Sequence, residues 1–345
     1  MSEVGGVSDG DGSTRTANIF DVARLAGVSH QTVSRVINDL PNVRPATRAR
    51  VEQAIAQLRY SPSPAARALV TRRTRTIGLV TPGVSDYGPT SIAMHFNFAA
   101  HAGRYNVETV SALEGDQAGV RAVIEGLLRQ RVDAIVLVVV DEDVLEVVRG
   151  LDLSVPVVAS ASSARRSPLI VSIDQYRGAR SAVRHLAELG HTRILHVAGP
   201  LRASDALERV RGWRDELAAH QLEVTDPRVG DWSAASGYEI GKTLDIEPGS
   251  AIFAANDHMA IGLLSALRER GLSIPADVSV VGFDDVPEAG YLYPPLTTVR
   301  QDFASLGVLM MQKVLIAVEE PDVKTEDTPI PTHLVVRQST SAPAP

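Results

Sequence analysis

The run from Ile19 to Tyr60 restricts the fold of this chain more than any other stretch of its 345 residues. A first short helix is predicted over Ile19 to Ala26, because apolar residues share one of its faces: Val22, Ala23 and Ala26. Gly27 can take the positive φ needed just past a helix end, and the Ser29 hydroxyl can accept a backbone N–H at the start of the next helix. Two helices joined by so short a turn predict a helix-turn-helix.

The second helix is expected from His30 to Asn38, with an apolar side made of Val33, Val36 and Ile37. Its polar side consists of five residues: His30, Gln31, Ser34, Arg35 and Asn38. Glutamine can bond to adenine and arginine to guanine in the major groove, and each good pair contributes about 1 to 3 kcal/mol of discrimination. A third helix, from about Ala46 to Arg59, closes a small core. The alternative is a helical hairpin whose polar side is only solvated.

Charge is divided unevenly along the chain, although the overall formal charge is only −7. The segment from Thr14 to Arg75 holds eleven arginines against three acidic residues, so the rest of the chain carries a formal charge of −15. A basic segment attached to an acidic body is typical of a protein that grips phosphate with one end only. The sequence therefore indicates a DNA-binding head.

The segment from residue 61 to 75, SPSPAARALVTRRTR, follows this head and is rich in alanine and arginine. Pro62 and Pro64 can begin a short helix, but one of this length is marginal in water by itself. Folding on contact with DNA is therefore expected, and a plain tether is the alternative.

From Thr76 onward, short Val- and Ile-rich runs alternate with helical stretches. The predicted strands are Ile77 to Val80, Val107 to Ser111, Ala134 to Val140, Val157 to Ala159, Leu169 to Ile173, Ile194 to Ala198, Ala251 to Ala254 and Val278 to Gly282. The predicted helices include Val120 to Gln130, Tyr176 to Leu189, Ala206 to His220 and Met259 to Glu269. Such alternation predicts α/β parallel sheets, and the number of strands fits two doubly wound lobes better than one. A ligand cleft is expected between the lobes, outside the carboxyl ends of the strands.

Candidate ligand-binding residues lie just after these strands or in loops. They are Asp86, Pro89, Asp205, Arg209, Trp232, Asn256, Asp284, Gln301 and Phe303. Asp, Asn and Arg can bond in pairs to the hydroxyl groups of a polyol, and Trp and Phe can cover the apolar face of a sugar ring. Each residue also has an ordinary structural explanation: Asp284 as a strand-end cap, Trp232 as a core aromatic, Arg209 as a solvated helix charge.

The segment DVARLAGVSHQTVSRVIN resembles the helix-turn-helix of the LacI-type family of bacterial repressors, and the resemblance continues to the end of the chain. It implies an N-terminal all-α head and hinge helix, followed by a two-lobed, periplasmic-binding-protein-like core. It also implies base contacts by His30, Gln31 and Arg35. The full expected DNA-binding set is Ser29, His30, Gln31, Thr32, Ser34, Arg35, Asn38, Ala66 and Leu69. In the family, a hinge leucine wedges into the minor groove, a role that Leu69 would take while Ala66 allows close helix approach.

Four further segments, GDWSA, AAND, VVGFDD and PPLTTVRQDF, resemble sugar-responsive members of this family. The resemblance implies effector contacts at Asp205, Arg209, Trp232, Asn256, Asp284, Gln301 and Phe303, and it points to a galactoside or related saccharide. Asp86 and Arg177 depart from those members and are hypothesised to form a new polar pair. A different sugar, a purine-type corepressor and an activator role stay open as alternatives.

The remaining expectations concern organisation and partners. We predict disordered tails at 1–17 and 339–345, the head at 18–60, the hinge at 61–75 and the effector-binding and dimerisation domain at 76–338. Some family members have a C-terminal leucine-heptad tail that makes tetramers. This chain ends LVVRQSTSAPAP, so a homodimer is expected.

Neither an export signal nor a membrane-spanning run is recognisable, so a cytoplasmic protein bound to double-stranded operator DNA and a saccharide is expected. This argues against the rival reading, a transport-type sugar-binding protein. The absence of cysteine excludes disulfides and thiolate metal sites, and no metal or cofactor is expected. An enzyme is disfavoured because adjacent acids on a strand, such as Asp284 and Asp285, point in opposite directions, and because GxSxG and HExxH are absent.

Overall fold

The computed structural model describes residues 17–37, 40–60, 73–112, 117–139, 144, 147–148, 150–162, 169–319 and 328–343. The chain forms two compact units, Met1–Thr74 and Arg75–Pro345. The predictions for Asn38, for Ala66 and Leu69 in the hinge, and for the first 16 residues lie outside the described residues. No helix among the residues described combines the length and apolar content that crossing a membrane requires.

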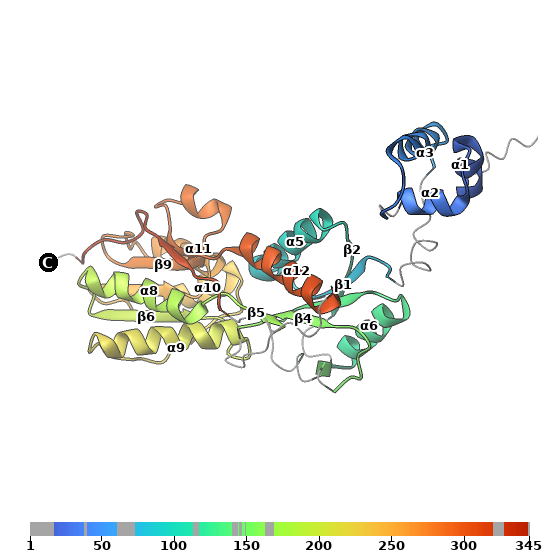
Figure 1. Cartoon of the computed structure of the whole chain (residues 1–345). Helices are drawn as coiled ribbons and strands as arrows, with labels where there is room; N and C mark the ends of the chain where they lie inside the picture. Colours follow the sequence, from blue (N-terminus) through green and yellow to red (C-terminus); the bar gives the residue numbers. More distant parts are fainter. Residues whose placement is uncertain are drawn as a thin grey trace, which may run out of the picture. The chain divides into compact units, whose positions relative to one another are not determined.

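The described residues of the first unit form three helices, α1 (Ile19–Ala26), α2 (His30–Ile37) and α3 (Pro45–Gln57) (Figure 1). They enclose a core that includes the predicted apolar residues Val22, Ala23, Ala26, Val33, Val36, Val51 and Ala54. Gly27 has a φ of 64° and donates its N–H to carbonyls in the last turn of α1. The Ser29 hydroxyl accepts the Thr32 N–H at 3.2 Å, as the turn signal predicted.

An additional cap at the start of α1 was not predicted. The Asn18 side chain accepts the N–H groups of Phe20 and Asp21, and the Asp21 carboxylate accepts the Asn18 N–H at 3.0 Å. This reciprocal capping box satisfies donors that a helix end leaves unpaired, so it contributes to holding this short helix in place.

The second unit begins with a lobe built on a five-stranded parallel sheet in the order β2-β1-β3-β4-β5. The strands are β1 (Thr76–Pro82), β2 (Asn106–Ala112), β3 (Ala134–Val138), β4 (Val157–Ser160) and β5 (Ile170–Val171). One face of the sheet is covered by α5 (Tyr87–Ala102) and α12 (Phe303–Glu319), and the other by α6 (Gln117–Arg129). The central strand β3 is buried throughout, as expected for a strand covered on both faces.

The second lobe contains a six-stranded sheet in the order β11-β10-β9-β8-β6-β7. Its strands are β6 (Arg193–Ala198), β7 (Arg228–Val229), β8 (Ser250–Ala254), β9 (Ser279–Asp284), β10 (Thr297–Arg300) and β11 (His333–Val335). Helices α8 (Gln175–Glu188) and α9 (Ser204–Ala219) pack on one face, and α10 (Ala234–Thr243) and α11 (Asp257–Glu269) on the other (Figure 1). The sheet is parallel except that β11 runs antiparallel to β10, a departure from the predicted pattern.

Every predicted strand is present with shifted ends, but several elements were not predicted: β7, β10, β11, α5, α10 and α12. Helix α5 was missed because Gly88 and Pro89 lie in its first turn, where they resemble a loop. Proline is tolerated in that turn because the N–H it lacks would have no partner inside the helix. The short helix η1 (Pro287–Tyr291) follows β9.

The chain passes between the two lobes after β5, between β10 and α12, and again near Ile330, which forms an isolated bridge with Ile173. Helix α12 therefore packs on the first lobe although it follows the second-lobe strands in sequence. Gln301 lies in one of these passages, and Gln175 begins α8 just after another.

The prediction of a disordered C-terminal tail is wrong for residues 339–343. The Ser339 side chain is buried, donates its hydroxyl to the Val280 carbonyl at 2.6 Å and accepts the Thr297 N–H at 2.8 Å. His191 holds the Ser341 carbonyl at 3.0 Å. These bonds fasten the segment to the beginnings of β9 and β10, a long-range contact that amino-acid composition alone does not reveal.

Candidate functional site

Helix α2 presents the predicted reading surface of the head. His30, Gln31 and Arg35 are exposed, whereas Thr32 and Ser34 are half-buried. The His30 ring lies 5.2 Å from the Phe20 ring, and Arg35 Nη2 donates to the Pro41 carbonyl at 3.1 Å. The Ser29 and Thr32 hydroxyls lie 3.0 Å apart and take part in the cap. The packing of α2 against α1 and α3 thus gives it an exposed polar edge, and base contact by its side chains stays a prediction.

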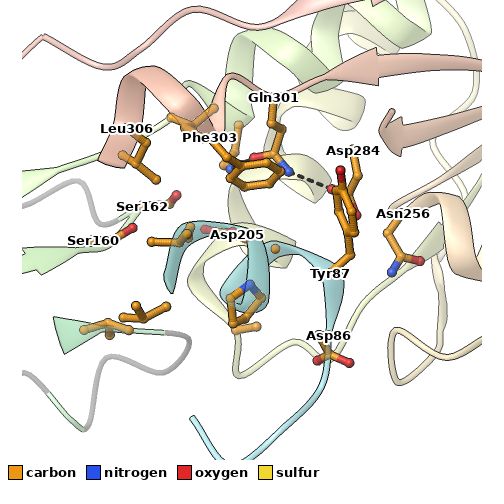
Figure 2. Close-up of a pocket in the computed structure, with 18 of the residues that line it drawn as sticks. Asp86, Tyr87, Ser160, Ser162, Asp205, Asn256, Asp284, Gln301, Phe303 and Leu306 are labelled. Atoms are coloured by element: carbon orange, nitrogen blue, oxygen red, sulfur yellow. Dashed lines mark hydrogen bonds between the residues drawn. The ribbon is translucent and has the colours of Figure 1, made fainter. Parts of the chain in front are cut away.

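The second unit contains a cavity lined by residues of both lobes (Figure 2). All nine candidate ligand residues line it: Asp86, Pro89, Asp205, Arg209, Trp232, Asn256, Asp284, Gln301 and Phe303. They are brought together because they follow strands whose carboxyl ends face this cavity, or begin helices that start there. Ligand binding by these residues stays a prediction.

A chain of buried hydrogen bonds forms the polar wall of the cavity. Gln301 Nε2 donates to Asp284 Oδ1 at 2.6 Å, and Gln175 Nε2 donates to Gln301 Oε1 at 2.7 Å. Arg209 Nε completes the chain by donating to Gln175 Oε1 at 2.9 Å. Because Gln175 and Gln301 lie where the chain passes between lobes, this wall connects Arg209 and Asp284 to the interlobe passages.

Arg209 is 3% exposed and is surrounded by partners. Its guanidinium donates from Nη1 to the Ala255 carbonyl and lies 3.9 Å from the Phe283 ring centroid. The Trp232 ring covers it at 5.4 Å. A buried arginine is stable only when it is paired in this manner, so the prediction of a solvated helix charge is excluded.

Trp232 has a φ of 73°, and its indole packs against Gly199, where a Cβ would collide with the ring. Asn256 Nδ2 donates to the Trp232 carbonyl at 2.9 Å, while Asn256 Oδ1 accepts the Met259 N–H and caps α11. Both polar atoms of this asparagine therefore have a partner within the protein. In this structure Asn256 acts by positioning Trp232.

Asp284 ends β9 and Asp285 follows it, with successive positive φ values of 115° and 57°. Buried Asp257 holds the following segment, since its carboxylate accepts the Thr298 hydroxyl at 2.6 Å and the Val286 N–H at 2.9 Å. Asp285 pairs with Arg300 and Arg337, each at 2.6 Å, and does not line the cavity. Strained backbone of this kind persists only where surrounding contacts enforce it. These contacts aim the Asp284 carboxylate at the cavity.

Burial raises the pKa of Asp284 to about 7. Arg209 and Gln301 oppose this rise, whereas the charges of Asp205 and Asp86 add to it. Tyr87 also has a raised pKa, chiefly through burial. The cavity therefore contains a carboxyl group that titrates close to neutral pH.

The pH dependence of stability follows from this pKa. Because the folded-state pKa of Asp284 lies above its unfolded value, the stabilisation is present in full below about pH 4 and is lost as pH rises through about 7. We expect the melting temperature of the natural protein to fall, relative to that of Asp284→Asn, as pH rises from about 5 to about 8. The difference in unfolding free energy should change by on the order of a few kcal/mol. If the melting temperatures of the natural protein and of Asp284→Asn change with pH in parallel, the raised pKa of Asp284 is contradicted.

The opposite side of the cavity is mainly apolar. Ile92, Val138, Phe303 and Leu306 line it, and the Tyr87 ring meets Phe303 edge-on at 5.8 Å. Tyr87 packs against the apolar cores of both lobes. The cavity thus combines an apolar wall with a hydrogen-bonding wall, as ligand pockets for small molecules commonly do.

Some lining residues were missed from the sequence, among them Tyr87, Ser160, Ser162, Gln175, Ala203 and Leu306. Ser160 ends β4 and Gln175 follows β5, so the rule that ligands sit beyond strand ends would have found both. Leu306 gives no such signal, because it faces the cavity only through the return of α12 to the first lobe.

The hypothesis that Arg177 forms a polar pair with Asp86 is wrong. Its side chain is 84% exposed, lies near the Asp174 carboxylate at 3.6 Å in the first turn of α8, and does not line the cavity. Its neighbour Gly178 packs against Phe283 and Thr332. Helix packing therefore turns the Arg177 position toward solvent.

Comparisons with known proteins agree with this arrangement. A model described as "Bacterial regulatory proteins, lacI family" matches residues 18–63, and one described as "Periplasmic binding protein-like domain" matches residues 183–340. The lactose operon repressor of Escherichia coli (strain K12) is 35% identical over 335 residues, covering 95% of this chain and 92% of the relative.

Two solved structures are similar over nearly the whole chain. The lac repressor dimer bound to operator and the anti-inducer ONPF has a TM-score of 0.85 at 32% identity, covering 95% of this chain and 100% of that one. The complex of the transcriptional regulator CelR with cellobiose has a TM-score of 0.69 at 30% identity, covering 94% and 99%. These relatives are named as transcriptional repressors or regulators. With such identity along nearly its full length, this chain belongs to the lacI family of bacterial regulatory proteins and is a DNA-binding transcriptional regulator.

Proposed function

We propose that this protein is a repressor that binds a palindromic operator as a homodimer and is released when a small, galactoside-like saccharide binds in the cavity. The observation that carries the effector part is the buried chain from Arg209 through Gln175 and Gln301 to Asp284. It presents paired donors and acceptors beside the Trp232 ring, which suits the hydroxyl groups and apolar face of a sugar.

The operator part of the proposal rests on the head. His30, Gln31 and Arg35 are exposed on one helix that the core of the head holds rigidly. A helix that inserts its first residues into the major groove reads base edges in this manner. A homodimer places two such helices on two half-sites, and the similar lac repressor structure is a dimer bound to operator.

Effector binding is coupled to DNA release through the arrangement of the two lobes. A saccharide that bonds to Arg209 and Asp284 also acts on Gln301 and Gln175, which lie at the interlobe passages. To release the operator, the saccharide must favour the arrangement of the two lobes that has the lower operator affinity. By linkage, the operator must then lower the affinity for the saccharide by the same factor. The same reasoning allows a different sugar or a purine-type corepressor, which the titration below distinguishes. We further infer that the protein acts in the cytoplasm and catalyses no reaction.

The test is a fluorescence anisotropy titration of a labelled palindromic operator at fixed salt, repeated with galactosides, glucosides, free sugars and purines. We expect one saccharide to weaken operator binding, and the operator to weaken binding of that saccharide by the same factor. Equal saccharide affinity with and without operator would refute induction. Release or tightening by a purine alone would refute the saccharide.

The reading surface is tested by Arg35→Ala, with Arg24→Ala as its control. Both changes remove one exposed arginine from the head, but Arg24 lies on α1 and pairs with Asp21. We expect Arg35→Ala to weaken operator binding by roughly 5- to 150-fold and to relax the preference at one base pair, because a base contact is lost. Arg24→Ala should weaken DNA binding only slightly, and by the same factor for every operator sequence. Equal effects would place Arg35 among phosphate contacts.

A further inference from the structure

Phe20 is a large apolar side chain outside the core of the head. It is 58% exposed and takes no part in the buried cluster that joins Val22, Val33 and Val51. Single exposed apolar residues are common on protein surfaces, so exposure by itself assigns Phe20 no role. Its contact with α2 does. The centroid of the Phe20 ring lies 5.2 Å from that of the His30 ring, with the two planes tilted by 45°, which is a favourable aromatic contact.

The backbone that carries Phe20 is fixed at the start of α1. The Phe20 N–H donates to Asn18 Oδ1 at 2.9 Å, and the Asp21 N–H donates to the same atom at 3.1 Å. Val22 and Ala23, the next residues of the helix, are buried in the core of the head. Capping bonds and core packing therefore hold the Phe20 ring in place although the ring itself is largely exposed.

His30 is the first residue of α2 and is exposed. A helical side chain leans toward the N-terminus of its helix, so that of His30 leans back over the turn before α2. This turn offers little packing, because Gly27 has no side chain and the Ser29 hydroxyl accepts the Thr32 N–H. The Phe20 ring reaches His30 from α1 instead. The ring contact therefore restricts an imidazole that would otherwise rotate freely in water.

We propose that Phe20 is a positioning residue for base reading, because its ring holds the His30 imidazole in the orientation that contacts the operator. This rests on the proposed function, since it requires α2 to enter the major groove. A side chain already held in its binding orientation loses less conformational entropy when it binds. The gain arises only where His30 makes its contact. Phe20 thus strengthens the preference at one base pair of each half-site without touching a base.

The variant Phe20→Ala removes the ring and keeps the helix, because alanine is the better helix former and Phe20 lies outside the core. An aromatic pair of this kind contributes a factor of about 2 to 12 to an equilibrium constant. We expect the preference at the base pair that His30 contacts to fall by about this factor, with the preference at other base pairs unchanged. Phe20→Tyr keeps the ring and should retain the preference.

The experiment uses the full chain and a library of palindromic duplexes with randomised half-sites. Sequencing the bound duplexes gives the operator. Anisotropy at fixed salt then gives the affinity for this operator and for duplexes changed at one base pair of each half-site. The proteins compared are the natural chain, Phe20→Ala, His30→Ala and the double variant. His30→Ala identifies the base pair concerned, and in its background Phe20→Ala should change the preference no further, since no imidazole is left to position.

Leu25→Ala is the matched control. Leu25 is another exposed apolar residue of α1, at 47%, and it also lies outside the buried cluster of the head. The change shortens an exposed apolar side chain on the same helix but leaves the contact between the Phe20 and His30 rings intact. It should leave the preference unchanged at every base pair.

The outcomes distinguish this inference from the operator proposal. If Phe20→Ala weakens binding to every duplex by one factor, Phe20 supports the head or contacts the DNA backbone, and the inference is overturned. If Phe20→Ala alters the preference even without His30, Phe20 reads the base itself, and positioning is overturned. If neither variant alters any preference while the natural chain selects an operator, the inference fails and the operator proposal stands. If the natural chain selects no palindrome, both fail together.

Discussion

Replacing Arg209 with methionine is expected to abolish the effector response while operator binding persists. The change leaves Asp284, Gln175 and the Ala255 carbonyl buried without their shared partner. Breaking a buried charge pair in this way costs about 3 to 5 kcal/mol of folding free energy. The effector loses a charged hydrogen-bond donor worth about 1.5 to 3 kcal/mol, so its affinity should fall by roughly ten- to a hundredfold. Calorimetry and operator release in the anisotropy assay measure the two parts separately.

Arg211→Met is the matched control for this experiment. Arg211 lies two residues further along α9, is half-exposed, and pairs with Glu208. Loss of an exposed ion pair costs about 1 kcal/mol or less, so effector affinity and release should stay near those of the natural protein. If both variants lose the response equally, helix destabilisation and not the Arg209 chain explains the result.

Replacing Val33 with aspartate is expected to abolish operator binding while effector binding continues. Val33 is fully buried in the small core of the head, where a carboxylate finds no partner. Burying an unpaired charge costs several kcal/mol, which is comparable with the whole stability of so small a core. The head should unfold alone, because it forms a unit separate from residues 75–345. Anisotropy and calorimetry on the same preparation test both halves of this expectation.

Leu25→Asp is the charge-matched control for the head. It introduces the same carboxylate at a half-exposed position on α1, so the added negative charge is present but the core is intact. Repulsion from DNA phosphates should weaken binding moderately and in a salt-dependent manner. If Leu25→Asp abolishes binding as completely as Val33→Asp, charge alone accounts for the loss.

The head was predicted well because its signals are local. Gly27, Ser29 and the apolar spacing of each helix act within a few residues, and the structure has the predicted helices with ends shifted by up to two residues. The same holds for the strands of the core, whose Val- and Ile-rich runs mark them directly. Elements with mixed signals were missed, such as α5 with Pro89 in its first turn.

The candidate ligand residues were predicted partly by their position after strands and partly by resemblance to a family. Neither position after a strand nor family resemblance predicts the hydrogen-bond and ion-pair partners of each residue. Arg209 appeared equally able to be a surface charge, and Arg177 appeared able to reach the cavity. Only helix packing decided that Arg209 is buried under Trp232 and that Arg177 points to solvent.

The sequence by itself determined the classes of secondary structure, the basic head with its acidic body, and the kinds of side chain that collect at strand ends. These depend on spacing and composition over a few residues. Tertiary structure alone decided the return of α12 to the first lobe, the Gln175–Gln301 bond across 126 residues, and the balance of charge inside the cavity. Those features depend on which distant segments meet, because burial and electrostatic coupling arise only once the two lobes have brought them together.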